Sequence, residues 1–227
     1  MITFRTFLVA AGLILCQSAA QCEEPVLLAP PAQDEVASNT HTEKAVLAGG
    51  CFWGIQGVFQ HVQGVSRVVS GYAGGGEATA HYETVGSGVT GHAESVEITF
   101  DPAQISYGAL LQIFFSVAHD PTELDRQGPD SGSQYRSAIF PATPSQRQVA
   151  QAYIAQLDAN HAFHAAIATR IEDGAHFYPA EDYHQDFLAL HPHYPYIVVN
   201  DLPKVAHLKQ VFPTRYRDQP VLVKPAA

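Results

Sequence analysis

The chain has 227 residues, of which 12 are Lys or Arg and 22 are Asp or Glu, for a formal net charge of −10. A hydrophobic fraction of 46% with only 15% charged residues supplies a sizeable core and excludes disorder along the whole length. A nucleic-acid binder needs clustered cations that neutralise phosphates, and no basic cluster interrupts the acidic balance. That class of protein is therefore disfavoured.

The first 20 residues have the pattern of a secretory signal peptide. Arg5 precedes an apolar run over 7–16, which is shorter than the about 20 residues that span a bilayer. The small residues Ser18 and Ala20 then fit a cleavage site after position 20. We expect a signal peptide over 1–20 and export to the periplasm or the medium. Lipidation of Cys22 is a weaker alternative, because a glutamine precedes it.

The periodicity becomes regular at residue 44, after a Pro- and Ala-rich stretch over 21–43 that is typical of a flexible linker. Ser106 and Thr143 are the expected N-caps of two helices. In chain order, the patterns predict a strand at 45–48, a helix at 51–61, strands at 65–72 and 94–100, a helix at 107–119, a strand at 135–140, a helix at 144–158, a strand at 167–172 and a short helix at 181–190. This order is that of a split βαβ unit with an extension, in one α+β domain.

The strongest local motif is GGCFWGIQGVF, in which Cys51 follows a strand and a Gly-Gly turn and begins a helix. The free N–H groups and the positive end of the helix dipole favour a thiolate there. We therefore expect a lowered pKa that makes Cys51 a nucleophile near neutral pH. Phe52 and Trp53 follow it and can wall a small apolar pocket. Taken alone, the motif also fits a buried cysteine that behaves as a small hydrophobe.

Two polar loops without regular structure supply candidate acid–base partners for the cysteine. Glu94 begins the alternating strand ESVEITF on its core side, where burial raises the pKa of a carboxyl and lets it hold a proton near pH 7. Tyr82 lies in the Gly-rich loop before this strand, and Asp130 and Tyr135 lie in the later loop. Tyrosine hydroxyls donate to a developing oxyanion without titrating. The structural alternatives are an exposed strand-end glutamate and tyrosines that only pack.

Two other functional classes remain open on these residues. An acyl hydrolase with a Cys–His pair would need a histidine positioned as the base. A non-catalytic export-pathway binding protein would leave Cys51 without a chemical role. The 12 histidines form no HExxH motif and the cysteines no CxxC motif, so we expect no metal site.

Five stretches in order, GCFWG, HYETV, GHAES, GPDSGSQYRSAIF and AEDYHQDF, resemble the peptide methionine sulfoxide reductase A family. The resemblance extends over 44–217, which leaves a C-terminal tail at 218–227. It implies a two-layer α/β sandwich with a ferredoxin-like core. It also implies reduction of methionine S-sulfoxide, free and in proteins, and thus repair of oxidised exported proteins.

The resemblance assigns catalytic roles to four residues. It implies that Cys51 attacks the sulfoxide sulfur, releases methionine and becomes a sulfenic acid, the first step of thiol oxidation. Glu94 would protonate the sulfoxide oxygen, and Tyr82 and Tyr135 would hydrogen-bond that oxygen as its charge grows.

The resemblance also assigns roles in substrate binding. Phe52 and Trp53 would hold the methyl group of the substrate in an apolar pocket, and Asp130 would help to order a polar site. His184, within AEDYHQDF, is expected to be structural support only.

The chain departs from many relatives because it has no cysteine after Cys51 to resolve the sulfenic acid. Cys22 is a possible resolving residue, since the arm between the two cysteines can extend by up to about 3.3–3.6 Å per residue. We favour direct reduction by an external thiol, thioredoxin-like or another dithiol donor. No bound cofactor is expected. The expected partners are oxidised proteins, free methionine sulfoxide and the thiol reductant, with no nucleic acid and no membrane span.

Overall fold

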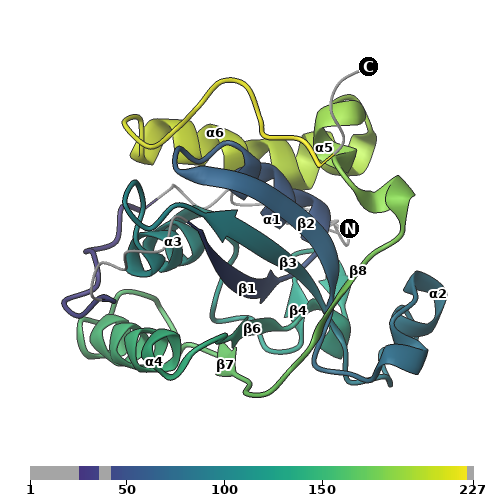
Figure 1. Cartoon of the computed structure of the whole chain (residues 1–227), viewed down its shortest axis with the longest axis horizontal. Helices are drawn as coiled ribbons and strands as arrows, with labels where there is room; N and C mark the ends of the chain where they lie inside the picture. The colour runs from purple at the N-terminus through teal and green to yellow at the C-terminus, as the bar shows by residue number, and fades with distance from the viewer. Residues whose placement is uncertain (1–25, 36–41, 224–227) are drawn as a thin grey trace, which may run out of the picture.

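The computed structural model describes residues 26–35 and 42–223, and its centre is a six-stranded sheet in the order β7-β6-β1-β3-β2-β8 (Figure 1). Neighbouring strands are antiparallel except for the parallel pair β6 and β7. The strands are β1 (Glu43–Gly49), β2 (Val65–Ala73), β3 (Ala93–Phe100), β6 (Ser137–Phe140), β7 (Arg170–Ile171) and β8 (Phe177–Pro179). A separate two-stranded ribbon pairs β4 (Arg126–Gln127) with β5 (Asp130–Ser131).

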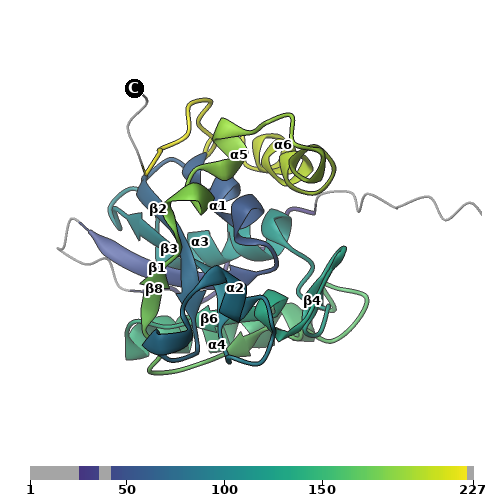
Figure 2. The same cartoon turned by 90° about the vertical axis from the view of Figure 1, so that its right-hand side faces the viewer.

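The four central strands form the expected ferredoxin-like core. Their order β6-β1-β3-β2 is produced by two crossover helices, α1 (Phe52–Gln60) between β1 and β2 and α3 (Tyr107–Ile113) between β3 and β6. Both helices lie on the same side of the sheet in the view of Figure 2. The predicted α+β class with a split βαβ core is confirmed.

The side-chain alternation of the strands explains the two layers. Leu47 of β1 and Val96 of β3 are paired in register and fully buried in the main core, together with the inward residues of α1 and α3. Ala48 of β1 points to the opposite face, where it joins a small cluster that includes Phe140. The larger apolar side chains therefore face the helical layer, which carries most of the core.

Both predicted N-caps are present. The Ser106 hydroxyl accepts a hydrogen bond from the Ala109 N–H at 3.2 Å at the start of α3. The Thr143 hydroxyl accepts one from the Gln146 N–H at 3.1 Å at the start of α4 (Pro144–Ala159). In each helix the side chain of the N-cap residue thus satisfies a backbone N–H of the first turn that has no partner within the helix.

Several predicted elements are shorter than the sequence patterns indicate. The segment 135–140 begins with a 3₁₀ turn and is a strand only from Ser137, and 167–172 pairs only at Arg170–Ile171. The expected helix at 107–119 ends in a π-helical turn, and the one at 181–190 divides into a 3₁₀ turn and α5 (Phe187–Leu190).

Besides the β4–β5 ribbon and the π-helical turn Ile197–Asp201, four elements were not expected from the sequence. The Gly-rich loop before β3 contains a 3₁₀ turn at Glu77–Thr79 and the short helix α2 (Tyr82–Val85), so its glycines do not exclude local structure. The other two are the edge strand β8 and α6 (Leu202–Val211). The helical period of α6 is weak, because only two of its ten residues are buried.

Residues 26–35 contradict the expected flexible linker over 21–43, because they pack against the helical layer. Leu28 is only 6% exposed and belongs to the main core. Its N–H donates to the Ser116 hydroxyl at 3.3 Å, and its carbonyl accepts from the Gln112 side chain at 2.7 Å. Pairing of these backbone groups by side chains gives the Pro-rich segment a fixed path without secondary structure.

The predicted signal peptide and Cys22 lie outside the described residues. In 26–35 and 42–223, no helix combines the length and apolar character needed to cross a membrane.

Candidate active site

Cys51 lies between β1 and α1, at the N-cap position of the helix. Gly50 before it has a φ of +93°, a conformation that favours glycine. The turn at this residue directs the chain from the end of β1 into α1. The cysteine is a free thiol and is 8% exposed. The two glycines at the end of the central strand β1 therefore place the Cys51 sulfur at the edge of the core.

Burial raises the pKa of the Cys51 thiol well above its ordinary value, and the carboxyl groups of Glu94 and Asp201 raise it further. The Trp53 backbone N–H and the Lys204 ammonium act in the opposite direction and are outweighed. The expectation of a lowered pKa at the helix start is therefore wrong for the resting site. Loss of hydration and two nearby carboxyl groups outweigh the helix N-terminus, so the resting thiol is protonated.

Glu94 lies beside the cysteine, on the core side of β3, and is 4% exposed. Its Oε2 accepts a hydrogen bond from the Phe52 N–H, the first peptide of α1, at 3.0 Å. Burial raises the pKa of this carboxyl to about 8, and the negative charges of Asp130 and Asp201 add to the rise. Glu94 thus holds a proton at neutral pH while it is bonded to Phe52, the residue that follows Cys51.

The structure brings Tyr82 and Tyr135 to the same site from two different loops. Tyr82 begins α2, and Tyr135 ends a 3₁₀ turn before β6. Burial raises the pKa of both phenols, and the nearby Glu94 and Cys51 raise it further. Both hydroxyls therefore remain protonated and available as hydrogen-bond donors beside the thiol.

Trp53 and Phe52 occupy different depths of the aromatic part of the site. Phe52 is 1% exposed and packs on the ring of His184 with 5.0 Å between centroids. Trp53 stacks on Phe187 at 3.9 Å and 9°, and its indole N–H donates to His184 Nδ1 at 3.2 Å. Burial lowers the pKa of His184, so the ring is neutral and its Nδ1 accepts. This contact is the structural support expected of the histidine.

Asp130 has a partner that the sequence analysis did not identify. Tyr196 donates its hydroxyl proton to Asp130 Oδ2 and lies edge-on to Trp53, with 6.1 Å between centroids and an angle of 83°. Burial and the nearby Cys51 raise the pKa of Tyr196. The segment HYPYIVV offers two tyrosines without a usable period, so no pattern distinguishes the one that enters the site.

Glu181 is a second carboxylate that only the tertiary structure reveals. It accepts from the Tyr72 hydroxyl at 2.8 Å and from the Tyr82 N–H at 3.0 Å. Burial raises the pKa of Glu181, but these donors outweigh burial and leave it lowered. The ionised carboxylate thus ties the start of α2 to β2 and holds Tyr82 in place.

The arrangement offers a nucleophilic sulfur, a protonated carboxyl, phenol donors and an aromatic wall. No described histidine hydrogen-bonds Cys51, because His184 accepts from Trp53 and His119 bonds the Phe114 carbonyl and the Ser137 hydroxyl. The Cys–His pair that an acyl hydrolase requires is therefore not formed in the described part of the chain.

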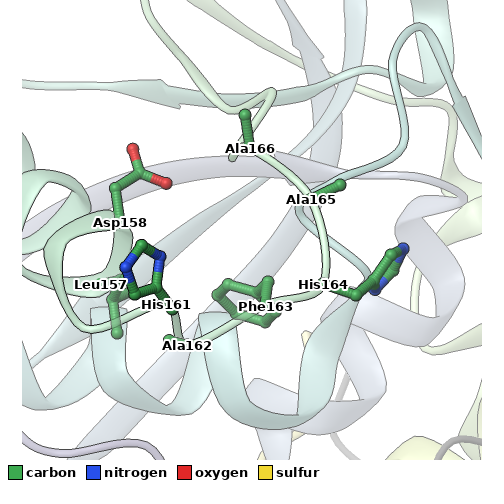
Figure 3. A pocket seen from close by; sticks show the side chains of 8 residues that line it. All are labelled: Leu157, Asp158, His161, Ala162, Phe163, His164, Ala165 and Ala166. Carbon is green, nitrogen blue, oxygen red and sulfur yellow. The ribbon is translucent and has the colours of Figure 1, made fainter.

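A separate surface hollow of about 380 Å³ lies at the end of α4 (Figure 3). Its lining includes Asp158, His161 and His164, and it shares no residue with the cysteine site. Among the residues that the structure describes, no group of three or more His, Cys, Asp or Glu side chains is arranged to hold a metal ion.

A free cysteine at a helix start beside a protonated carboxyl is an arrangement typical of enzymes that use a thiol nucleophile. The family model described as peptide methionine sulfoxide reductase matches residues 43–216. A peptide methionine sulfoxide reductase MsrA 2 from Mesorhizobium japonicum is 64% identical over 186 residues, covering 82% of this chain and 95% of that protein. Its Synechocystis counterpart is 59% identical over 178 residues, covering 78% and 83%.

Two solved structures agree with these sequence relatives. Reduced Mxr1 from Saccharomyces cerevisiae superposes with a TM-score of 0.60 at 29% identity, covering 70% of this chain and 91% of that one. Methionine sulfoxide reductase A of Corynebacterium diphtheriae gives 0.57 at 32% identity, covering 70% and 81%.

The chain belongs to the peptide methionine sulfoxide reductase family, as its motifs predict. It is an oxidoreductase with peptide-methionine (S)-S-oxide reductase activity, which reduces methionine sulfoxide and thereby repairs proteins. The roles of the individual site residues follow from the geometry and are proposed below.

Proposed function

We propose that Cys51 reduces methionine S-sulfoxide, free or in a protein, by direct attack on the sulfoxide sulfur, with Glu94 as the proton donor. The observation that carries this mechanism is the buried, protonated Glu94 carboxyl bonded to the first peptide of the cysteine helix at 3.0 Å. Nucleophile and acid thus share one water-poor site, where a positioned carboxylic acid protonates a reacting oxygen efficiently.

The proposed proton transfers begin from a Cys51 thiol and a Glu94 carboxyl that are both protonated at rest. Glu94 gives its proton to the sulfoxide oxygen and takes the thiol proton, so that the sulfur attacks as a thiolate only when substrate is present. The oxygen moves to Cys51, which becomes a sulfenic acid, and methionine leaves. The substrate sulfur gains the two electrons that the cysteine sulfur loses, which balances the step.

The surrounding side chains divide the substrate between an apolar and a polar half. Trp53, stacked on Phe187, and the buried Phe52 form the aromatic wall for the methyl group. Tyr82 and Tyr135 keep their protons and donate to the sulfoxide oxygen as negative charge develops there.

The polar half is completed by Asp130, which is held by Tyr196 and helps to order the polar side of the site.

We also infer that the enzyme acts outside the cytoplasm and is recycled by an external thiol. The pattern of residues 1–20 supports export, and the absence of any cysteine after Cys51 supports reduction by a separate thioredoxin-like or other dithiol donor. Cell fractionation tests the first inference, with recovery of the chain in the cytoplasm as the contradicting result. Cys22 remains the internal alternative for the second.

The test of the mechanism is the intact mass of the exported protein before and after one equivalent of methionine S-sulfoxide, without reductant. A gain of one oxygen at Cys51, with release of one equivalent of methionine, is the expected result. Loss of two hydrogens would show that Cys22 resolves the intermediate. Methionine release without any change at Cys51, or an untouched sulfoxide beside a free Cys51 thiol, would contradict the proposal. Cys51→Ser is the control, and it should neither gain an oxygen nor release methionine.

A further inference from the structure

Asp201 is a buried carboxyl for which the mechanism above has no use. It ends the π-helical turn Ile197–Asp201 and is 0% exposed. Its Oδ1 lies 3.2 Å from the Lys204 ammonium, whereas its Oδ2 has no hydrogen-bond partner among the described residues. An ion pair in this position loses the hydration of both charges, which is costly unless every polar atom is satisfied.

A second ion pair of α6 differs from this one in exposure. Lys209 and Asp218 form an exposed ion pair at 2.9 Å, with side chains that are 60% and 77% exposed. Lys204, in contrast, is only 18% exposed, and its partner is fully buried. The Asp201–Lys204 pair therefore loses hydration that the exposed pair keeps.

The buried pair lies directly against the first turn of α1, the helix that Cys51 begins. Gly54, three residues after the cysteine, leaves the space that the pair occupies. A Cβ at this position would lie 2.8 Å from Asp201 Cγ and 2.9 Å from Lys204 Nζ, too close for either group to remain. Because Gly54 has no side chain, the Asp201 carboxyl and the Lys204 ammonium can both contact the first turn of α1.

Charges in a buried, low-dielectric region act over longer distances than charges in water. The Asp201 carboxyl disfavours negative charge on Cys51, and the Lys204 ammonium favours it. The other ionisable groups around the sulfur are Glu94 from β3, Tyr82 from α2, Tyr135 from the turn before β6 and Tyr196 from the turn before α6. Among these groups, Lys204 is the one cation near Cys51.

We propose that Asp201 and Lys204 are positioning residues whose opposed charges, placed beneath the first turn of α1, set the reactivity of Cys51. Asp201 disfavours the thiolate form of Cys51, and Lys204 limits that effect. This inference rests on the proposed role of Cys51 as the nucleophile, but it concerns the sulfur itself and not the sulfoxide.

The test measures alkylation of Cys51 by iodoacetamide as a function of pH in the whole protein, followed by the mass of the Cys51 peptide. Asp201→Asn keeps the shape and the contact with Lys204 but removes the negative charge. We expect its alkylation midpoint to move to lower pH by about half a unit or more, which is about a threefold gain in thiolate below the midpoint. Lys204→Gln should move the midpoint to higher pH.

Lys209→Gln is the matched control, since it removes the exposed cation of the same helix, and it should leave the midpoint unchanged. Circular dichroism identifies the variants that fold. An unchanged midpoint in folded Asp201→Asn overturns the proposal. If that variant does not fold, an unchanged midpoint in Lys204→Gln overturns it, and if neither folds the pair is structural and the proposal is wrong.

Because alkylation requires no sulfoxide, this outcome is independent of whether Cys51 attacks sulfoxides. A shifted midpoint in a protein that gains no oxygen from methionine S-sulfoxide would reject the proposed function and keep the role of the pair.

Discussion

The groups that react and the groups that surround them come from two different regions of this molecule. Cys51 and Glu94 lie on the β1–α1 junction and on β3, within the ferredoxin-like core. His184, Tyr196 and Asp201 come from the C-terminal part, where 3₁₀ and π-helical turns replace long regular elements. The core carries Cys51, Glu94, Phe52 and Trp53 on regular elements, and the irregular region adds aromatic and charged groups that contact or surround them.

This division predicts that substitutions in the core region remove the chemistry outright, whereas those in the C-terminal region change its rate or its pH dependence. Three of the predictions below test that difference, and the one at Leu28 tests the packing of residues 26–35.

Cys51→Ser should lower methionine S-sulfoxide reduction by about 10³-fold or more, because a serine oxygen cannot be oxidised by the sulfoxide as the cysteine sulfur is when it becomes a sulfenic acid. The fold should remain, since serine is close to cysteine in size and shape. Turnover with a dithiol reductant and the thermal midpoint are the two measurements. Retained turnover in the serine variant would mean that the nucleophile lies elsewhere.

Glu94→Gln should lower kcat by about 10²-fold, the usual contribution of a positioned general acid. Because burial raises the pKa of Glu94 to about 8, the acid form is present below that pH and is lost above it. Activity of the wild type should therefore fall as the pH rises through about 8. The glutamine variant should lack this fall, and a pH profile that keeps it would contradict the assignment of the acid.

Leu28→Ala should lower the free energy of unfolding by about 2–3 kcal/mol, because it empties a buried position of the core. Leu27→Ala is the matched control: Leu27 is 60% exposed, so its loss should change stability by less than about 0.5 kcal/mol. Denaturant unfolding of both variants is the measurement. Equal stabilities would show that the segment 26–35 does not pack as described.

Tyr196→Phe should reduce kcat/KM by about tenfold, since it removes the hydrogen bond that holds the half-buried Asp130 carboxyl in place. The ring remains, so the edge-on contact with Trp53 should persist. Tyr194→Phe is the control, because Tyr194 also lies edge-on to Trp53 but is 49% exposed. A loss of similar size in both variants would assign the effect to the aromatic wall and not to Asp130.

Most of the core could be predicted from the sequence because its causes are local. The alternation of ESVEITF places Glu94 inward, and the hydroxyls of Ser106 and Thr143 begin two helices with the expected bonds. Each of these patterns is complete within a few residues of chain. The C-terminal environment follows no such pattern, because α6 has a weak period and β8 is only three residues long.

The contacts that complete the site join residues far apart in the chain. Trp53 and His184 are separated by 131 positions, and Asp130 and Tyr196 by 66. No periodicity extends over such distances, so only the folded chain identifies these partners. The segment 26–35 is a similar case, because its order depends on side chains of the helical layer.

Short sequence windows are enough to identify the family and to predict Cys51 as the nucleophile and β3 as the strand of the acid, since motif and alternation are local properties. The charge state of the cysteine depends on the folded chain. The helix start predicts a lowered pKa for Cys51, but burial and the carboxyl groups of Glu94 and Asp201 raise it. Desolvation and the field of distant charges are sums over the folded molecule, and at this site they exceed the local effect of the helix N-terminus.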